Sequence, residues 1–333
     1  MGRTAVMELI RYKRISRSIR KPVETMQFYV LVRMMLKEDA LKFTKMQGIG
    51  NDYVYVNCLD QAVDNPSSLS RMVSDRHFGI GSDGLILIRP SVKADFFMEM
   101  FNADGSRSAM CGNGIRCVGK YVYDHGLTDK TELTVNTLDG VKYLTLDVEE
   151  GHVVSVTVDM GEPHLDPDTI PVLANRSPVV AEPIEIGARR FEMTCVSMGN
   201  PHAVIFVDST IGYPVHEIGR AFEFHPTFPE RVNAEFVEVL NRSEVNMRVW
   251  ERGAGETLAC GTGACASTVA CVLNGLTDDE ITVHLIGGDL FVRWDRQLNR
   301  VFMSGPAATV FEGEIDISQC PVDDPPHVVD PSW

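Results

Sequence analysis

Long apolar segments are absent from this sequence: none of its 333 residues belong to a run near the about 20 residues that a membrane-spanning helix needs. Basic residues are also few, with 31 Lys and Arg against 46 Asp and Glu. Residues 1–40 hold nine basic and four acidic residues, so the remainder holds 31 − 9 = 22 and 46 − 4 = 42, a net charge of −20. Because nucleic-acid binding depends on positive charge, this acidic body argues against a nucleic acid as partner.

No C-x2-C pair occurs, although the chain has eight cysteines. Zinc knuckles and thiol redox motifs use that spacing, so the sequence favours neither. A chain of this length without a secretory signal is not typical of a disulfide-rich secreted protein, and we expect reduced thiols in the cytoplasm. We also expect no cofactor and no metal, although the sequence alone does not exclude pyridoxal phosphate or a metal ion.

Residues 1–40 form a basic segment that lacks the apolar core of a secretory signal. We interpret the segment as an extension outside the folded core, or as a start codon placed too far upstream. An Arg-rich transit peptide is the alternative. Within the segment, residues 26–36 could form a short helix or strand on the surface, and the well-patterned chain begins near Leu41.

Short apolar strands, separated by turn residues and a few helices, follow Leu41 and indicate an α/β (α+β) fold. The expected strands are 53–57, 85–88, 96–101, 131–137, 153–159, 203–207, 235–240, 245–250, 281–285 and 289–294. The expected helices are 67–76, 113–125, 215–223 and 262–274. The second and fourth helices stop at Gly126 and Gly275, as a left-handed C-cap requires.

Two cysteine motifs indicate that the chain repeats itself. C-G-N-G-I-R-C begins at Cys111 and C-G-T-G-A-C-A begins at Cys260, an offset of 260 − 111 = 149. Other features recur at this offset: Gly50-Asn51 with Gly199-Asn200, the strand 98–101 with 247–250, and Asn102 with Glu251. Self-similarity at a fixed offset identifies repeated structural units.

We therefore predict two homologous, pseudo-symmetric domains, each a mixed or antiparallel sheet wrapped around a central helix. The first domain is 41–155 together with a returning C-terminal strand at 307–316, and the second is 156–306. If the two domains pack about a pseudo-twofold axis, their motif cysteines can face each other across a cleft.

Each motif cysteine precedes Gly-X-Gly and an expected helix. Free N–H groups at a helix start bind a carboxylate, and the same field favours a thiolate. One facing thiolate can remove an α-proton while the other thiol protonates the opposite face, which inverts a stereocentre. The alternative is that cysteines are buried packing residues; we adopt it for Cys117, Cys265 and Cys271, and assign no role to Cys58, Cys195 and Cys320.

These residues resemble those of diaminopimelate epimerases over residues 41–315. The motifs are M-Q-G-I-G-N-D-Y at 46–53, F-N-A-D-G-S at 101–106, M-C-G-N-G-I-R-C at 110–117, G-N-P-H at 199–202, P-E-R-V-N at 229–233 and E-R-G-A-G-E-T-L-A-C-G-T-G-A-C-A at 251–266. The resemblance implies cofactor-independent interconversion of LL- and meso-2,6-diaminopimelate, in the synthesis of lysine and of cell-wall precursors. It also implies two α/β domains with this small-molecule substrate between them, and a homodimer.

The resemblance further implies residue roles. Cys111 and Cys260 would be the acid/base thiols, with Cys111 written as the donor and Cys260 as the acceptor from LL to meso. His202 and Glu251 would lie beside the reacting centre, and Glu251 with Arg252 would help to hold the amino and carboxylate groups. Backbone N–H groups of four residues would hold the reacting carboxylate: Gly112, Asn113, Gly261 and Thr262. Four amides would select the distal L-centre: Asn51, Asn102, Asn200 and Asn233.

Taken singly, these residues have plainer interpretations. Asn51 and Asn200 could be turn residues, His202 a structural histidine, and Glu251-Arg252 a solvated ion pair. The sequence also departs from the family pattern at Gly84, where many relatives carry glutamine; backbone or water could replace that contact. The N-terminal extension is the second departure.

Three other functions compete with this interpretation. Proline racemase-like enzymes use the same two-cysteine logic, but their substrates lack a distal amino-acid end for the asparagines and Glu251-Arg252 to bind. A thiol redox protein would need an exposed cysteine pair of low pKa, and a binding protein for amino acids would need one cysteine or none. Solvent-deuterium exchange at the α-carbon of LL-diaminopimelate distinguishes these functions.

Overall fold

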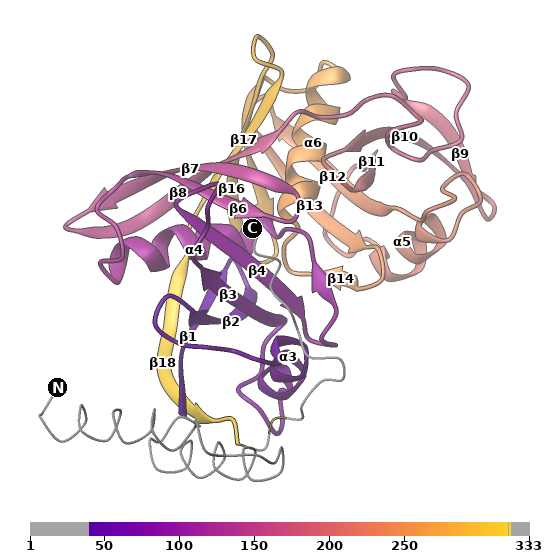
Figure 1. The fold of residues 1–333 in the computed structure, drawn as a ribbon. Coiled ribbons are helices and arrows are strands. Elements are labelled where there is room, and N and C mark those ends of the chain that lie inside the picture. The colour runs from indigo at the N-terminus through magenta and orange to yellow at the C-terminus, as the bar shows by residue number, and fades with distance from the viewer. Residues whose placement is uncertain (1–39, 319, 321–333) are drawn as a thin grey trace, which may run out of the picture.

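The computed structural model describes residues 40–318 and residue 320. The N-terminal extension and the helix or strand considered at 26–36 lie outside these residues. The described chain forms two lobes (Figure 1), and the yellow C-terminal strand runs along the indigo start of the first lobe. No helix in the described part of the chain is both long enough and apolar enough to cross a membrane.

The two halves follow one another along the chain. The first half is built from β1 (Ala40–Gly48), β2 (Asn51–Asn57), α3 (Pro66–Ser74), β3 (Gly84–Arg89), β4 (Phe96–Asn102), β5 (Arg107–Ser108), α4 (Gly112–Asp124), β6 (Glu132–Thr137), β7 (Gly140–Glu149) and β8 (His152–Gly161). The second half is built from β9 (Glu182–Ile186), β10 (Arg189–Ser197), β11 (Pro201–Phe206), α5 (Val215–Glu223), β12 (Asn233–Asn241), β13 (Glu244–Glu251), β14 (Gly255–Thr257), α6 (Gly261–Leu273), β15 (Glu280–Leu285), β16 (Gly288–Asp295) and β17 (Arg300–Gly305), and β18 (Ala308–Asp316) follows it.

The 149-residue offset holds for whole elements. Strand β10 repeats β1 (189 − 40 = 149), helix α5 repeats α3 (215 − 66 = 149), and helix α6 repeats α4 (261 − 112 = 149). Pairings repeat as well: β2 runs parallel to β3 with Tyr53 opposite Gly84, and β11 runs parallel to β12 with His202 opposite Asn233. The predicted fold class, an α/β protein of two homologous halves, is confirmed.

Two strand pairings join the halves to each other and close the chain. Strand β8 pairs antiparallel with β17, and Arg300 Nε lies 2.7 Å from an oxygen of Asp159 across this junction. Strand β18 pairs antiparallel with β1 from Leu41–Ile315 onward, in the place that β9 takes beside β10 (Figure 1). The first half therefore includes the last strand of the described chain.

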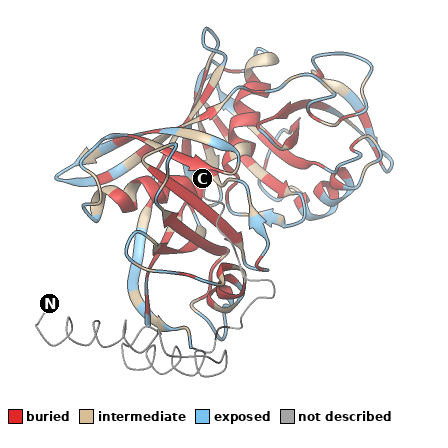
Figure 2. Ribbon diagram, viewed as in Figure 1, coloured by how far each residue is buried: buried red, intermediate tan, exposed pale blue. Residues whose placement is uncertain are grey.

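Helices α4 and α6 form the centre of the molecule. Figure 2 shows both helices largely buried, and their apolar residues belong to one continuous core. Both helices end as predicted: Gly126 and Gly275 follow the C-caps at positive φ values of 67° and 68°. Because α6 is small or apolar on nearly every side, it can be enclosed by its own sheet and still contact α4.

All the expected helices and strands occur, and their ends differ from the prediction by at most two residues. The prediction omitted β1, β7, β9, β10 and β17, and also the two- and three-residue strands β5 and β14. Strand β18 (Ala308–Asp316) lies within the range of the returning C-terminal strand that was expected at 307–316.

Gly84 has no room for a side chain. A Cβ atom at this position would lie 2.1 Å from the backbone oxygen of Phe101 and 2.8 Å from Cε1 of Tyr53. Both neighbours are buried, and Tyr53 is also the strand partner of Gly84. The ring of Tyr53 therefore lies close to the space where a side chain at residue 84 would begin.

We predict that Gly84→Ala lowers the free energy of unfolding by about 1–3 kcal/mol, because an extra methyl group forces the backbone of a closely packed strand to move. Val92→Ala, on the exposed loop after β3, is the control and should stay within about 0.5 kcal/mol of the wild type. Urea denaturation followed by circular dichroism measures both. A Gly84→Ala protein as stable as the control would show that the strand pair relaxes freely.

Candidate active site

A pocket of about 420 Å³ lies between the N-termini of α4 and α6. Eleven of the thirteen residues predicted for the site line it: Asn51, Asn102, Cys111, Gly112, Asn113, Asn200, Glu251, Arg252, Cys260, Gly261 and Thr262. Both halves contribute to the lining, and both motif cysteines are part of it. The predicted residues that lie elsewhere are His202 and Asn233.

Cys111 and Cys260 have the same structural position. Each is the N-cap of its helix with an extended backbone, at φ −138° and ψ 119° for Cys111 and φ −123° and ψ 110° for Cys260. Each sulfur accepts a hydrogen bond of 3.3 Å from a backbone N–H three residues later, that of Gly114 or of Gly263. The sulfurs thus take the place that a Ser or Asp oxygen has in an ordinary N-cap.

The glycine after each cysteine allows close packing between the two helix starts. A Cβ atom at Gly112 would lie 3.0 Å from Cε of Met303, and one at Gly261 would lie 3.2 Å from Sδ of the same residue. Met303 belongs to β17 and is buried. Larger residues would push the helix starts away from this side chain, so the Gly-X-Gly sequences keep the two N-termini together.

Burial raises the pKa of both thiols, but their other neighbours differ. Around Cys111, backbone N–H groups of Gly114 and Asn113 and the charge of Arg116 lower the pKa, while Glu251 raises it. The pKa of Cys260 is raised well above its usual value, first by burial and then by Glu251 and Glu235. The two thiols therefore differ in how readily they ionise.

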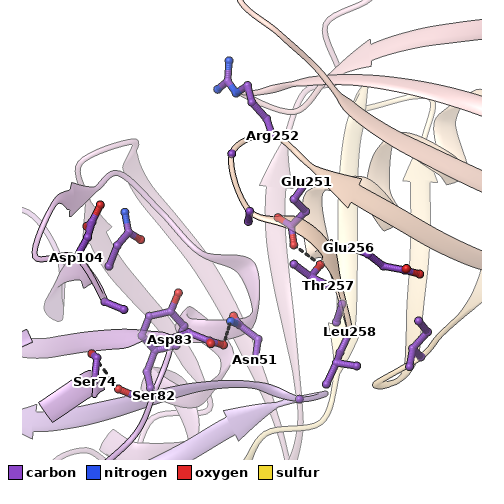
Figure 3. A pocket seen from close by; sticks show the side chains of 18 of the residues that line it. Asn51, Ser74, Ser82, Asp83, Asp104, Glu251, Arg252, Glu256, Thr257 and Leu258 are labelled. Carbon is purple, nitrogen blue, oxygen red and sulfur yellow. Dashed lines mark hydrogen bonds between the residues drawn. The ribbon is translucent and has the colours of Figure 1, made fainter. Parts of the chain in front are cut away.

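Asn51 is held rigidly beside Cys111. Its Oδ1 accepts a hydrogen bond of 3.2 Å from the Cys111 thiol, and its Nδ2 donates one of 2.7 Å to Asp83. Arg76 in turn forms ion pairs of 2.8 Å with Asp83 and with Asp52. Figure 3 shows the Asn51–Asp83 hydrogen bond in the cleft, on the side opposite Glu251 and Thr257.

His202 lies behind the pocket and acts on it through Asn200. His202 Nε2 is 3.0 Å from Asn200 Oδ1, and His202 Nδ1 is 2.7 Å from Glu235, with both ionisable side chains fully buried. Asn200 Nδ2 donates to Thr262 Oγ1 at 3.3 Å, and that hydroxyl lies 3.5 Å from the Cys260 sulfur. A chain of polar contacts thus runs from His202 to Cys260.

Strand β13 ends at Glu251, and Arg252 follows it, at the rim of the pocket. The Thr257 hydroxyl donates a hydrogen bond to Glu251, as Figure 3 shows, and burial raises the pKa of Glu251. The Arg252 guanidinium donates to the backbone oxygen of Glu230 at 2.9 Å and points away from Asn51 in Figure 3. In this arrangement Arg252 lines the entrance.

Asn233 is buried under the loop that carries Arg252. Its Nδ2 donates to the Pro201 oxygen and its Oδ1 accepts from the Arg252 backbone N–H, both at 2.8 Å. Both ends of the amide are therefore used within the protein. A direct contact of Asn233 with substrate stays a prediction.

Tyr53 is a pocket residue that the sequence analysis did not name. Burial raises its phenol pKa well above the usual value, Cys111, Asp83 and Glu251 add to the rise, and a hydrogen bond with Asn51 opposes it. The signal that could have found Tyr53 is the repeat itself, because 202 − 53 = 149 pairs it with His202.

A wider cleft of about 1140 Å³ shares residues with the pocket and opens between the halves (Figure 3). Charged side chains of both signs line it: Arg76, Arg248, Arg252, Asp83, Asp104, Glu251 and Glu256. Among the described residues, no group of three or more His, Cys, Asp and Glu side chains is arranged to hold a metal ion. The cleft suits a ligand that carries both ammonium and carboxylate groups.

Comparison with known proteins extends these findings. The family model "Diaminopimelate epimerase" matches residues 43–165 and 194–310. The diaminopimelate epimerase of Acetivibrio thermocellus is 58% identical over 279 residues, covering 84% of this chain and 100% of the relative. That of Agathobacter rectalis is 60% identical over 284 residues, covering 83% and 100%.

Solved structures with the same fold are more distant. A hydroxyproline epimerase from Agrobacterium vitis matches with a TM-score of 0.61 at 14% identity, covering 85% of this chain and 94% of that one. A PhzF-family phenazine biosynthesis protein from Bacillus anthracis matches with a TM-score of 0.62 at 15% identity, covering 83% and 99%. On the sequence matches, the chain is an enzyme of the isomerase class and belongs to the diaminopimelate epimerase family.

Proposed function

We propose that this protein interconverts LL- and meso-2,6-diaminopimelate with Cys111 and Cys260 as its two acid/base groups. The observation that carries the proposal is that both cysteines cap helix N-termini and line one pocket between homologous halves. We further propose that the enzyme uses no pyridoxal phosphate, works in the cytoplasm as a homodimer, and supplies lysine and cell-wall precursor synthesis.

In the reaction, one cysteine enters as thiolate and the other as thiol. The thiolate takes the α-proton, and the C–H electron pair moves into the adjacent carboxylate to give a planar carbanion. The second thiol then donates its proton to the opposite face, and its sulfur keeps the S–H electron pair. The thiolate and the thiol have exchanged places, so the next turnover in the same direction requires a proton to move back.

The helix starts suit this chemistry because charge develops on the carboxylate. Backbone N–H groups at Gly112-Asn113 and Gly261-Thr262 lie at the two helix N-termini, where the helix dipole is positive. Donors that are fixed before the reaction stabilise the carbanion without reorganising, and they are most effective in a site that excludes water. The carboxylate of the reacting centre therefore binds between the two helices.

The distal amino-acid end of the substrate distinguishes this function from proline racemase-like chemistry. Asn51, Asn102 and Asn200 supply amide groups, and the charged cleft residues provide both signs needed for a zwitterion. Arg252 can pair with a carboxylate through two N–H groups after turning inward. The test is an epimerisation assay with LL-diaminopimelate, in which proline and hydroxyproline serve as control substrates; turnover of the cyclic substrates alone would refute the assignment.

We predict that Cys111→Ala and Cys260→Ala each lower kcat by at least about 10²–10⁴-fold, because each thiol serves one face of the α-carbon. The double variant should be little worse than either single one, since residues that act as one unit are not additive. Cys271→Ala, a buried helix cysteine outside the pocket, is the control and should retain kcat. Chiral chromatography of the product gives the rates. A Cys260→Ala variant with wild-type kcat would show that Cys260 is a packing residue and not an acid/base group.

The pH dependence follows from the direction of the thiol pKa shifts. Since the pKa values of Cys111 and Cys260 are both raised, the pair is mainly protonated at neutral pH and one thiolate must form for turnover. We expect kcat/KM to rise above pH 7 by about tenfold per pH unit, and to fall again where the second thiol ionises and no acid remains. A profile that decreases steadily from pH 7 to 9 would contradict this assignment.

Glu223 fixes the loop that presents Glu251 and Arg252. It is buried at the end of α5, where it accepts hydrogen bonds from Trp250 Nε1 at 2.7 Å and from the Gly253 backbone N–H at 3.0 Å. These contacts lie on both sides of Glu251-Arg252. Glu223 thus connects both sides of this loop to helix α5.

We predict that Glu223→Gln raises KM more than it lowers kcat, because an amide NH2 would face one of the two N–H donors and release the loop. The same mismatch should lower the free energy of unfolding by about 1–3 kcal/mol. Glu217→Gln makes the same change at an exposed position of the same helix and is the control. Steady-state kinetics and urea denaturation measure the two effects. An unchanged KM in Glu223→Gln would show that the position of the loop does not affect substrate binding.

A further inference from the structure

Arg116 is a buried cation that forms no ion pair with a carboxylate among residues 40–318. It lies in helix α4 with its whole side chain enclosed, and its hydrogen bonds go to neutral groups: Nε to the Pro306 oxygen at 3.3 Å and Nη1 to the Gly112 oxygen at 3.2 Å. Nη2 has no hydrogen-bond partner among the described residues. A buried charge is strongly unfavourable when no opposite charge compensates it.

Burial lowers the pKa of Arg116, and the groups that oppose this most are three thiols and a phenol: Cys117, Cys111, Tyr55 and Cys265. Of these, Cys111 caps the same helix and lines the pocket. Cys111 is therefore one of the groups whose ionisation would place a negative charge near Arg116, and it is the one of the four that lines the pocket.

The surrounding backbone is shaped around the guanidinium. A Cβ atom at Gly48 would lie 3.1 Å from Arg116 Nη2, and one at Gly305 would lie 3.3 Å from Nε. Two glycines, one in β1 and one in β17, thus leave the space that the planar group occupies. The guanidinium is held in one place beside the first turn of α4.

The second half has an acidic group beside its equivalent cysteine, and no arginine at the position equivalent to Arg116. Position 116 + 149 = 265 is the neutral Cys265, and position 86 + 149 = 235 replaces Ile86 by the buried carboxyl group of Glu235. A Cβ at Gly263 would lie 2.9 Å from Glu235 Oε1, so this carboxyl group lies beside the start of α6. A cation therefore lies near Cys111, and a carboxyl group lies near Cys260.

We propose that Arg116 is a positioning residue that makes Cys111, and not Cys260, the cysteine that releases its proton first in the unliganded protein. This rests on the proposed function, in which the two thiols share one reaction. As the pH rises, Cys111 gives its proton to solvent first and Cys260 keeps its own, so the reactive form of the pair has one base and one acid.

The other groups that face the two sulfurs support this order. Near Cys111 they are Tyr53 and Tyr55 from β2, Cys117 from α4 and Glu251 from β13, and only Glu251 is an acid of ordinary strength. Near Cys260 they are Glu251 and Glu235, with His202 in contact with Glu235. Cys260 therefore faces two carboxyl groups that disfavour its thiolate, Glu251 and Glu235, whereas Cys111 faces Glu251 together with the Arg116 cation.

The test measures the pH dependence of alkylation of each thiol by iodoacetamide, with peptide mass spectrometry separating Cys111 from Cys260. The thiolate displaces iodide and forms a stable S–C bond, so the rate follows the thiolate fraction. In the full-length wild-type protein the midpoint for Cys111 should lie below that for Cys260. In Arg116→Met, the Cys111 midpoint should rise by about one pH unit, which is about tenfold slower alkylation at a fixed lower pH, while Cys260 shifts less.

Two variants serve as controls. Arg116→Lys keeps a positive charge and should keep most of the difference, and Arg242→Met removes a surface charge paired with Asp278 and should change neither midpoint. A lower midpoint for Cys260 in the wild type, or an unchanged Cys111 midpoint in a folded Arg116→Met protein, would overturn the proposal. If Arg116→Met does not fold, the proposal is tested by which thiol has the lower midpoint in the wild type and in Arg116→Lys. These alkylation measurements do not depend on whether diaminopimelate is turned over.

Discussion

Each motif cysteine caps a helix with its own sulfur, and the other features of the site depend on that contact. The 3.3 Å hydrogen bonds from Gly114 and Gly263 hold the sulfurs at the helix starts, where backbone N–H groups are free to bind a carboxylate. The glycines that follow each cysteine bring both helix starts against Met303. The groups proposed for anion binding and for proton transfer therefore share one small volume, which is the geometry that inversion of a carbon next to a carboxylate needs.

The two halves have the same backbone plan but different charges. Duplication places two equivalent thiols in one pocket, whereas substitutions behind them supply a guanidinium on one side and a buried His–Glu pair on the other. In a symmetrical pair of thiols, either one could lose the first proton with equal ease. Unequal surroundings favour the mixed state, with one base and one acid, in which a two-base reaction can begin.

Much of the fold could be predicted from the sequence because the repeat is visible in it. The offset between Cys111 and Cys260 also relates α3 to α5 and β1 to β10, so one pair of motifs indicated the plan of both halves. Strand β18 was expected as the strand that returns to the first half, but its register against β1, with Leu41 opposite Ile315, could not be predicted because it depends on residues far apart in the chain. The positions of His202 and Asn233 could not be predicted either, since which side chains face the pocket and which lie behind it depends on tertiary packing.

The central claim is that two different bases act on opposite faces of one carbon. The most direct test is to start the reaction from unlabelled LL-diaminopimelate in deuterium oxide and to analyse both isomers at early times. The account predicts that the meso product carries one solvent deuterium at the inverted carbon while the remaining LL substrate is still unlabelled. The reason is that one cysteine removes the substrate hydrogen from one face, and the other cysteine, which has exchanged with solvent, donates deuterium to the opposite face. A meso product that retains the original hydrogen would mean that a single group carries the proton from one face to the other, and would contradict the account.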